Sequence, residues 1–249
     1  MQGQSVEQRR PVEDARLSPE MTTTDLLAIY EKIGGFTSSD LATAVEILSE
    51  FVQLDGCLRF LSFTGNIVAT GLRGVIADLL RRGYFDVVIT TGGTVDHDIA
   101  RGFGGKYYQG SFDMDDLALE RERVHRLGNV LIPAEDYGPL IEKSVFPLFD
   151  EMCASKEEWS GREVLQFVGR KVNDSSSILR AAADRGIPVY SPGLMDSAFG
   201  TNLFVFSQTR RFRLNLLQDA KELSDLVFPA ERSGALVLGG GISKHHTIW

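Results

Sequence analysis

The chain has 249 residues, of which 43% are hydrophobic and 24% charged, and its formal net charge at pH 7 is −8. These values are typical of a globular protein. The negative charge argues against nucleic acid as the main partner, because phosphate binding requires a basic surface. No apolar run approaches the roughly 20 residues that span a bilayer, and the polar N-terminus lacks the apolar stretch of a secretory signal. Two cysteines are too few for a disulfide framework or a zinc site, so we expect a cytoplasmic protein.

The N-terminal part of the chain predicts an arm and two helices. Residues 1–20 are polar and charged and contain two prolines, which is typical of a flexible arm. Thr22–Thr24 offer N-caps for a helix that ends near the glycine pair at 34–35. Ser38 or Ser39 offers the cap of a second helix.

The remaining chain alternates apolar runs with helical patterns. Strands are predicted at 58–63, 85–90, 187–190 and 235–238, and 129–132 is either a strand or an extended connector. The run FDVVIT is apolar without alternation, as in strands buried on both faces of a parallel sheet. Helices are predicted at 67–82, 135–153, 161–172, 175–185 and 212–226. This order predicts an α/β fold, a Rossmann-like parallel sheet with helices on both faces, in a single domain over 21–249.

Four of the predicted strands are followed by loops rich in small and polar residues. They are TGN at 64–66, TGG at 91–93, SPGLMD at 191–196 and GGG at 239–241. Ligands of open parallel sheets bind beyond the carboxyl ends of the strands, where glycine permits close backbone approach and helix N-termini favour phosphate. Neither the G-x-G-x-x-G fingerprint nor a P-loop is present. A dinucleotide would therefore be held by a non-standard set of loops.

Titratable side chains follow two of these loops. Asp96, His97 and Asp98 come directly after TGG and fit an amine better than a metal, because adjacent residues project in different directions. A helix cap with solvated charges is the alternative. His245, after GGG, is placed to act as a general base, although a purely structural histidine is an equal alternative.

Five segments together resemble deoxyhypusine synthase, in order and with compatible spacing, from about residue 20 to the end. They are TTGGTVDHDIAR (90–101), GSFDMDD (110–116), HRLGNVLIP (125–133), SPGLMDSAFG (191–200) and LGGGISKHH (238–246). The DHD triplet is similar to that of the archaeal branch. The resemblance implies a homotetramer that binds NAD and spermidine at dimer interfaces. It further implies transfer of the butylamine group of spermidine to an enzyme lysine, and then to a lysine of the translation initiation factor 5A precursor.

The resemblance also implies roles for individual residues. The NAD-binding positions are Gly65, Asn66, Ile67, Val68, Ala69, Thr91, Gly92, Gly93, Asp96, Asp196 and Gly240. The spermidine-binding positions are Asp96, His97, Thr201 and His245, and His245 is the catalytic histidine. His97 and Thr201 replace carboxylates of the eukaryotic enzymes, so two anionic contacts to the amine are missing.

The nucleophilic lysine of the family has no counterpart in this sequence. None of the seven lysines matches its position, and neither tryptophan is followed by Gly-Lys. We therefore expect a C-terminally truncated enzyme, inactive alone. The alternatives are a non-catalytic NAD-binding subunit that supports an active paralogue, or a related polyamine aminobutyltransferase that acts on a free amine. A more distant alternative is another NAD-consuming enzyme, such as a protein deacylase.

Overall fold

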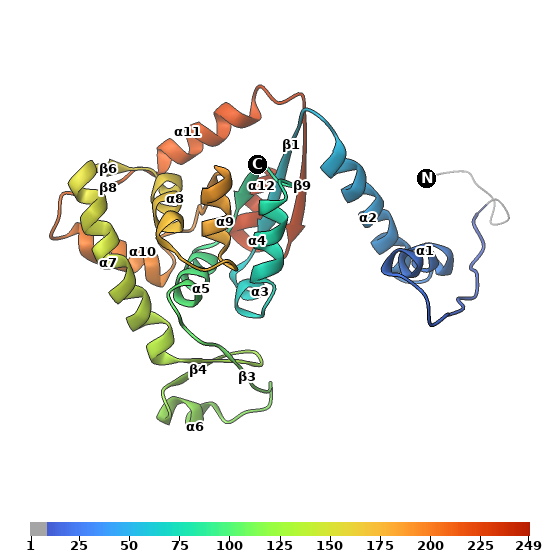
Figure 1. The fold of residues 1–249 in the computed structure, drawn as a ribbon, viewed down its shortest axis with the longest axis horizontal. Helices are drawn as coiled ribbons and strands as arrows, with labels where there is room; N and C mark the ends of the chain where they lie inside the picture. Colours follow the sequence, from blue (N-terminus) through green and yellow to red (C-terminus); the bar gives the residue numbers. More distant parts are fainter. Residues whose placement is uncertain (1–8) are drawn as a thin grey trace. The chain divides into compact units, whose positions relative to one another are not determined.

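The computed structural model describes residues 9–249. The chain divides into two compact units, one up to Asp55 and the other Gly56–Trp249, and Figure 1 draws both. The sequence-based boundary near residue 20 and the single domain after it stay predictions. The arm predicted for 1–20 lies partly outside the described residues, and residues 9–20 contain no helix or strand.

The first helix of the N-terminal unit, α1 (Thr23–Ile33), begins and ends where the sequence predicts. Thr22 forms a capping box, in which its hydroxyl accepts from the N–H of Asp25 and the Asp25 carboxylate accepts from the N–H of Thr22. Gly34 ends the helix in the left-handed conformation with φ of 64°. Both ends follow the usual capping chemistry, which is why they can be predicted.

The second helix, α2 (Ser38–Gln53), is also confirmed, but its predicted cap is wrong. The N-cap is Thr37, whose side chain makes no capping hydrogen bond. The Ser38 hydroxyl instead donates to the carbonyl of Gly35 at 2.8 Å. The serine side chain therefore closes the preceding turn and leaves the first N–H groups of the helix uncapped.

Four parallel strands form the central sheet of the second unit, as predicted. Their order is β7 (Val189–Tyr190), β2 (Val87–Ile89), β1 (Cys57–Phe63) and β9 (Arg232–Leu238). Ser62 is in register with Ile89 on one side and Val237 on the other, and all three pairings are parallel. All four strands therefore end at the same edge of the sheet.

Helices cover both faces of this sheet (Figure 1). On one face, Phe60 and Ile89 pack with Leu223 of α11 (Leu216–Val227), and α12 (Gly241–Ile248) lies against β1 and β2. A groove of about 510 Å³ remains between α11, β9 and α12. On the opposite face, where alternate residues point, Leu61, Phe63 and Val88 are fully buried.

The remaining helices of the unit follow the prediction in part: segments 135–153, 161–172 and 175–185 are largely helical as predicted, whereas no helix range was predicted over 92–102 or 198–207. They are α3 (Gly65–Ala69), α4 (Arg73–Arg81), α5 (Gly92–Gly102), α7 (Gly138–Ser155), α8 (Gly161–Lys171), α9 (Ile178–Arg185) and α10 (Ala198–Ser207), with a 3₁₀ turn at Ala134–Asp136. The single helix predicted at 67–82 is wrong, because Gly71 adopts φ of 98° and separates α3 from α4. The helix predicted from residue 212 begins later, at Leu216, because residues 213–214 form a strand.

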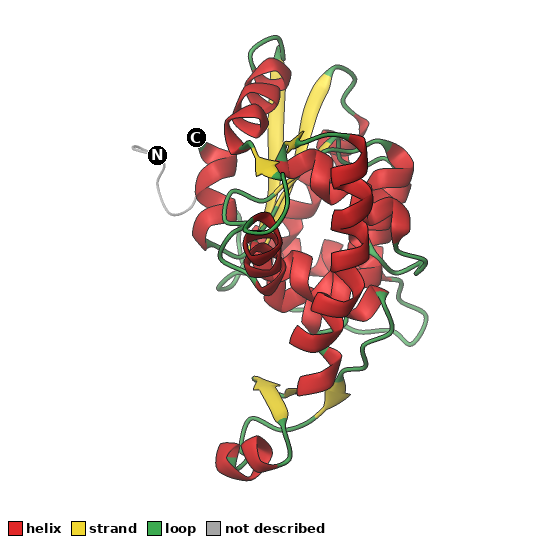
Figure 2. Ribbon diagram, turned by 90° about the vertical axis from the view of Figure 1, so that its left-hand side faces the viewer, coloured by secondary structure: helices red, strands yellow, loops and turns green. Residues whose placement is uncertain are grey.

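A small subdomain, residues 108–133, projects from this unit (Figure 2). It contains β3 (Tyr108–Gln109), α6 (Asp116–Arg121), β4 (Val124–Leu127) and β5 (Val130–Pro133). The strands form an antiparallel sheet in the order β3-β5-β4, so 129–132 contributes to a strand that lies outside the main sheet. Two further short strands, β6 (Glu158–Trp159) and β8 (Arg213–Leu214), pair in parallel.

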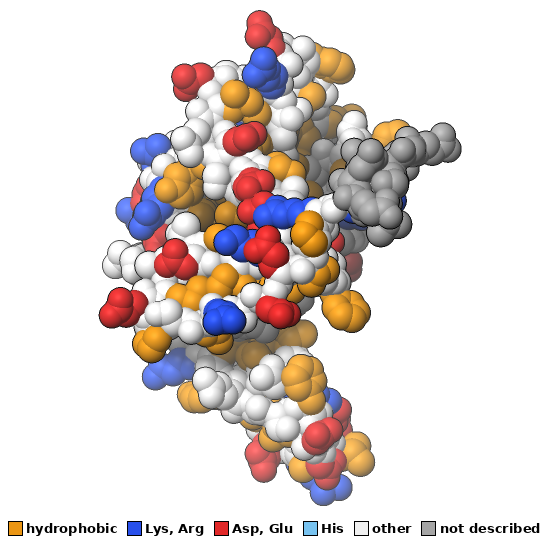
Figure 3. Space-filling view, turned by 90° about the vertical axis from the view of Figure 1, so that its right-hand side faces the viewer, with side chains coloured by type: hydrophobic (Ala, Val, Ile, Leu, Met, Phe, Trp, Pro, Cys, Tyr) orange, Lys and Arg blue, Asp and Glu red, His pale blue; other side chains and the backbone are white. Residues whose placement is uncertain are grey.

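The surface carries both signs of charge. On the face drawn in Figure 3, acidic and basic side chains are interspersed with hydrophobic ones. Among the described helices, none is both long enough and apolar enough to cross a membrane.

Candidate functional site

The four loops singled out in the sequence lie together at the carboxyl edge of the sheet. A Cβ atom placed on Gly65 would lie 2.7 Å from the carbonyl carbon of Gly93, so loops 64–66 and 91–93 are in contact. A Cβ atom on Gly92 would lie 2.9 Å from the carbonyl oxygen of Gly193, in the third loop. A Cβ atom on Gly239 would lie 3.0 Å from the Thr64 hydroxyl oxygen. The four loops therefore form one continuous cluster.

The glycines of this cluster have two different surroundings. Gly65 and Gly92 are buried, and other loops fill the space that a side chain would need. Gly93 has only the Thr91 hydroxyl near that space, at 3.9 Å, and Gly240 has no atom within 4 Å of it. The first pair lets the loops pack against each other, whereas the second pair leaves backbone open to a ligand.

Helices begin at all four loops, and their N-termini differ in capping. The first of them, α3, has only five residues, and its N-cap residue Thr64 makes no side-chain capping bond. Asp96 and Ser197 accept hydrogen bonds from the first N–H groups of α10. The N-cap residues of α5 and α12, Thr91 and Gly240, make no side-chain capping bond. The free N–H groups and the helix dipole at these two ends favour an anion such as a phosphate.

Asp96 points into the protein. Its Oδ1 accepts from the N–H of Phe199 at 2.8 Å, and its Oδ2 accepts from the N–H of Ala198 and the hydroxyl of Tyr137, both at 2.9 Å. The residue is 2% exposed. Burial raises the pKa of Asp96, and the three hydrogen bonds oppose that rise.

His97 is enclosed between two tyrosine rings. Its Nδ1 lies 2.8 Å from the hydroxyl of Tyr107, and the ring of Tyr137 is 5.3 Å away. Burial, helped by the positive charge of Arg101, lowers the pKa of His97 to about 4. The imidazole is therefore neutral at neutral pH.

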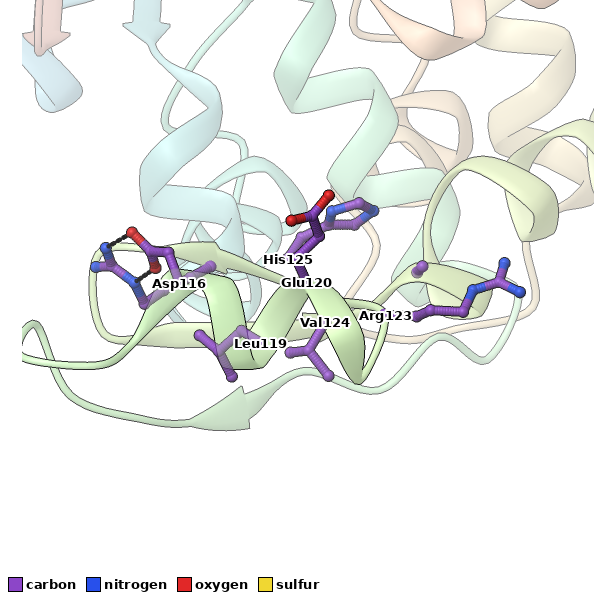
Figure 4. A pocket seen from close by; sticks show the side chains of 8 residues that line it. Asp116, Leu119, Glu120, Arg123, Val124 and His125 are labelled. Atoms are coloured by element: carbon purple, nitrogen blue, oxygen red, sulfur yellow. Dashed lines mark hydrogen bonds and ion pairs between the residues drawn. The ribbon is translucent and has the colours of Figure 1, made fainter.

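The cavity next to His97 does not suit a cation. It measures about 240 Å³ and is lined by His97, His125, Arg126, Leu127, Ile132 and Tyr137. The guanidinium of Arg126 is paired with Asp116 at 2.6 Å. Both residues also line a neighbouring pocket of about 390 Å³ (Figure 4), and this pocket and the cavity have His125 and Arg126 in common. No carboxylate lines the first cavity, so an ammonium group there would meet neutral and positive side chains.

A buried ionic network beneath α5 was not predicted. Asp98 is fully buried, and it accepts from Arg73 Nε at 2.5 Å, from the Ser177 hydroxyl at 2.8 Å and from the first two backbone N–H groups of α9. Arg73 also pairs with Asp174. The sequence showed Asp98 only as part of an acidic triplet, because its partners are up to 81 residues away.

The other predicted site residues lie around the cluster. Asn66 and Asp196 are exposed in the first and third loops, and the Thr64 hydroxyl donates to Asn66. Thr201 is exposed in the first turn of α10, where its hydroxyl donates to the carbonyl of Ser197. His245 is exposed on α12.

The predicted residues of α3 are less accessible than these. Ile67 is half-buried, and Val68 and Ala69 are buried. Among the described residues, no hydrogen bond or ion pair joins His97 to His245. Residues 9–249 also contain no group of three or more His, Cys, Asp or Glu side chains that could hold a metal ion.

A comparison with protein-family models identifies the family of the chain. The model of deoxyhypusine synthase matches residues 25–249. The chain belongs to the deoxyhypusine synthase family. The resemblance seen in the five sequence segments is confirmed at this level, and the family is one of transferases.

Known relatives agree with this membership. A protein of Sulfolobus acidocaldarius named as a deoxyhypusine synthase is 50% identical over 238 residues, which cover 96% of this chain and 76% of that protein. One from Ignicoccus hospitalis is 51% identical over 246 residues, with 97% and 76% coverage. A crystal structure named as a deoxyhypusine synthase of Entamoeba histolytica has a TM-score of 0.68 at 22% identity, covering 92% of this chain and 79% of that one. The last likeness supports the fold.

Proposed function

We propose that the chain carries the cofactor cradle of an NAD-dependent deoxyhypusine synthase, which transfers the butylamine group of spermidine to a lysine of the translation initiation factor 5A precursor. The observation that carries this proposal is the pair of uncapped helix N-termini, those of α5 and α12, beside open glycines at one sheet edge. A third helix at the same edge is already capped by Asp96. The helix at the first loop, α3, has only five residues, so we assign the cradle to the N-termini of the two longer uncapped helices.

The open glycines fit a dinucleotide. A side chain at Gly240 would occupy empty space at the start of α12, and Gly93 leaves the start of α5 similarly accessible. The N–H groups of both helices would hold the two phosphates, and Asn66 and Asp196 are exposed beside them for polar contacts. When bound, NAD supplies an acceptor for a hydride from the amine carbon of spermidine.

His245 is the residue proposed to move a proton. It is exposed in the second turn of α12, the helix whose N-terminus contributes to the cradle. An imidazole there can remove a proton from an amine of the substrate. Thr201, exposed in the first turn of α10, is a neutral hydrogen-bonding group for the same amine.

The amine contact proposed for His97 receives no support from its geometry. Its ring is held by Tyr107, stays neutral and faces a cavity with Arg126. We therefore place the amine on the side of Thr201 and His245. A His97→Gln variant should leave the affinity for spermidine within about twofold, whereas His245→Ala should lower it.

The proposed cradle is tested by titration calorimetry of NAD against the full chain. Gly240→Ala places a methyl group in the open space and should weaken NAD binding about tenfold or more, which is about 1.4 kcal/mol. Gly138→Ala is the matched control, because Gly138 also begins a helix and also has no atom within 4 Å of its Cβ position. Equal affinity of the two variants would contradict the proposal.

The covalent step is tested separately. No lysine of this sequence matches the family's nucleophile, so we expect no imine between the chain and labelled spermidine. Borohydride trapping in the presence of NAD would detect one, and a labelled adduct on Lys244 would overturn this expectation. NAD binding without an adduct also fits a non-catalytic subunit, which should raise the transfer activity of an active paralogue when the two are mixed.

A further inference from the structure

Helix α5 carries two buried aspartates, and each holds the start of a different helix. Asp96 accepts from the first two backbone N–H groups of α10, at 2.9 and 2.8 Å. Asp98 accepts from the first two backbone N–H groups of α9, at 3.1 and 2.9 Å. The two carboxylates are therefore equivalent clamps, each occupying a helix N-terminus that would otherwise attract an anion.

Each clamp is completed by one hydroxyl group. Tyr137 donates to Asp96 Oδ2 at 2.9 Å, and Ser177 donates to Asp98 Oδ2 at 2.8 Å. Burial raises the pKa of Tyr137, so its hydroxyl remains a donor at neutral pH. The Ser177 hydroxyl also caps α9 by accepting from the N–H of Arg180 at 3.1 Å, so its removal should cost at least as much stability as removal of the Tyr137 hydroxyl and is a stringent control for NAD affinity.

The clamps differ in what they hold. Helix α10 follows directly from the loop 191–197, which packs on Gly92 so closely that a Cβ there would lie 2.9 Å from the carbonyl oxygen of Gly193. The clamp of Asp98 joins α5 to α9 and, through Arg73, to α4. Neither α9 nor α4 contains a residue of the four loops.

We propose that Asp96 is a positioning residue of the candidate cofactor site, which holds loop 191–197 against the start of α5 by clamping α10. A carboxylate offers about four acceptor positions, and three of them are used inside the protein at a residue that is 2% exposed. Asp96 therefore acts on the ligand through the loop. The ligand in this inference is that of the proposed function.

The test compares Tyr137→Phe with Ser177→Ala in the full chain. Each variant removes one hydroxyl donor from a buried carboxylate, so both should lower the free energy of unfolding in urea. Tyr137→Phe should in addition lower the affinity for NAD about three- to tenfold and speed amide hydrogen exchange at Ala198 and Phe199. Ser177→Ala should leave NAD affinity within about twofold, and speed exchange at Ile178 instead.

A third variant separates positioning from direct contact. Asp96→Asn keeps the size of the side chain, but its amide NH₂ cannot accept a hydrogen bond, so we expect NAD affinity to fall about tenfold or more with fast exchange at Ala198. A loss of affinity with unchanged exchange at Ala198, and no effect of Tyr137→Phe, would show direct contact and overturn the proposal. Equal losses of NAD affinity in Tyr137→Phe and Ser177→Ala would overturn it as well, because the effect would then be one of stability alone.

Failure of the proposed function has a different signature. A wild-type chain without measurable NAD affinity would refute the cofactor, and exchange at Leu194 would then test the clamp, because the N–H of this buried residue donates to the carbonyl of Ser191 at 3.0 Å within loop 191–197. Faster exchange at Leu194 in Tyr137→Phe but not in Ser177→Ala supports positioning. Unchanged exchange at Leu194 in both variants contradicts it.

Discussion

Gly92 and Gly93 are adjacent in the sequence but lie in opposite surroundings. A side chain on Gly92 would meet Ser197 and two backbone carbonyl oxygens of the third loop within 3.0 Å. A side chain on Gly93 would meet only the hydroxyl of Thr91, at 3.9 Å. The pair therefore separates a closed side of the cluster, where loops pack on each other, from an open side, where the backbone can approach a ligand.

The difference shows that a glycine at a strand end has two physical readings. On the closed side, glycine is needed because the neighbouring polypeptide occupies the position of Cβ, as at Gly65. On the open side, no atom of the protein occupies that position, as at Gly240. Only the second kind is a direct argument for a ligand. Substitutions should therefore affect stability on the closed side and binding on the open side.

The largest effect is expected deep on the closed side, at Asp98. Asp98→Asn removes the charge that faces Arg73 at 2.5 Å in a fully buried position. Arg73 keeps its pair with Asp174, but the amide NH₂ of asparagine cannot accept the hydrogen bonds made to one carboxylate oxygen, and loss of a charged partner from a buried pair costs about 3–5 kcal/mol. Urea denaturation followed by circular dichroism measures this loss. Asp184→Asn, which breaks an exposed pair with Arg180, is the control and should change stability by less than about 1 kcal/mol.

His97, on the enclosed side of α5, should make stability depend on pH. Its pKa is about 4 in the folded protein, against 6.5 for the free side chain, so the unfolded chain binds more protons between these values. Stability is then complete above pH 6.5 and falls as the pH drops towards 4, by about 3 kcal/mol at most. His97→Gln should lose less stability than the wild type over this interval. Parallel pH profiles of the two proteins, measured by urea denaturation, would contradict the prediction.

The sequence predicted the sheet edge well because its signals are local. The run at β2 is apolar without alternation, which is typical of a strand buried on both faces, and its three residues are buried. Each of the four predicted strands is followed directly by a loop of small and polar residues. Helix α10 was not predicted because its own apolar residues lie on all of its sides, with Phe199 buried and Phe204 exposed. Such a helix shows no amphipathic period.

The interior of the site could not be predicted in the same way. Arg73 and Asp174 pair across 101 residues, and nothing in their local sequence marks them as partners. The triplet of Asp96, His97 and Asp98 was seen as a group facing an amine. In the structure, Asp96 instead binds the start of α10, Asp98 binds the start of α9, and His97 lies between two tyrosines. The three side chains diverge because successive residues of a helix point about 100° apart.

Gly92→Ala tests the closed side of the comparison directly. The added methyl group must displace backbone of the third loop, and overpacking of this kind costs about 1–3 kcal/mol. We expect a lower midpoint of urea denaturation, with NAD affinity falling as well because loops 91–93 and 191–197 move apart. A variant as stable as the wild type would show that the two loops are not packed as described.

Gly93→Ala tests the open side and should have the smallest effect on stability. Alanine favours a helix over glycine by up to about 1 kcal/mol, and its methyl group meets no close neighbour in the protein, so the free energy of unfolding should stay equal or rise. NAD affinity, measured by titration calorimetry, should nevertheless fall, because the methyl group lies at the uncapped start of α5. A variant that is stable but binds NAD more weakly would show that the space beside Gly93 serves the ligand, whereas the space beside Gly92 is filled by packing. Unchanged binding would place the ligand away from α5 and leave the start of α12 as the part of the proposed cradle that could still bind it.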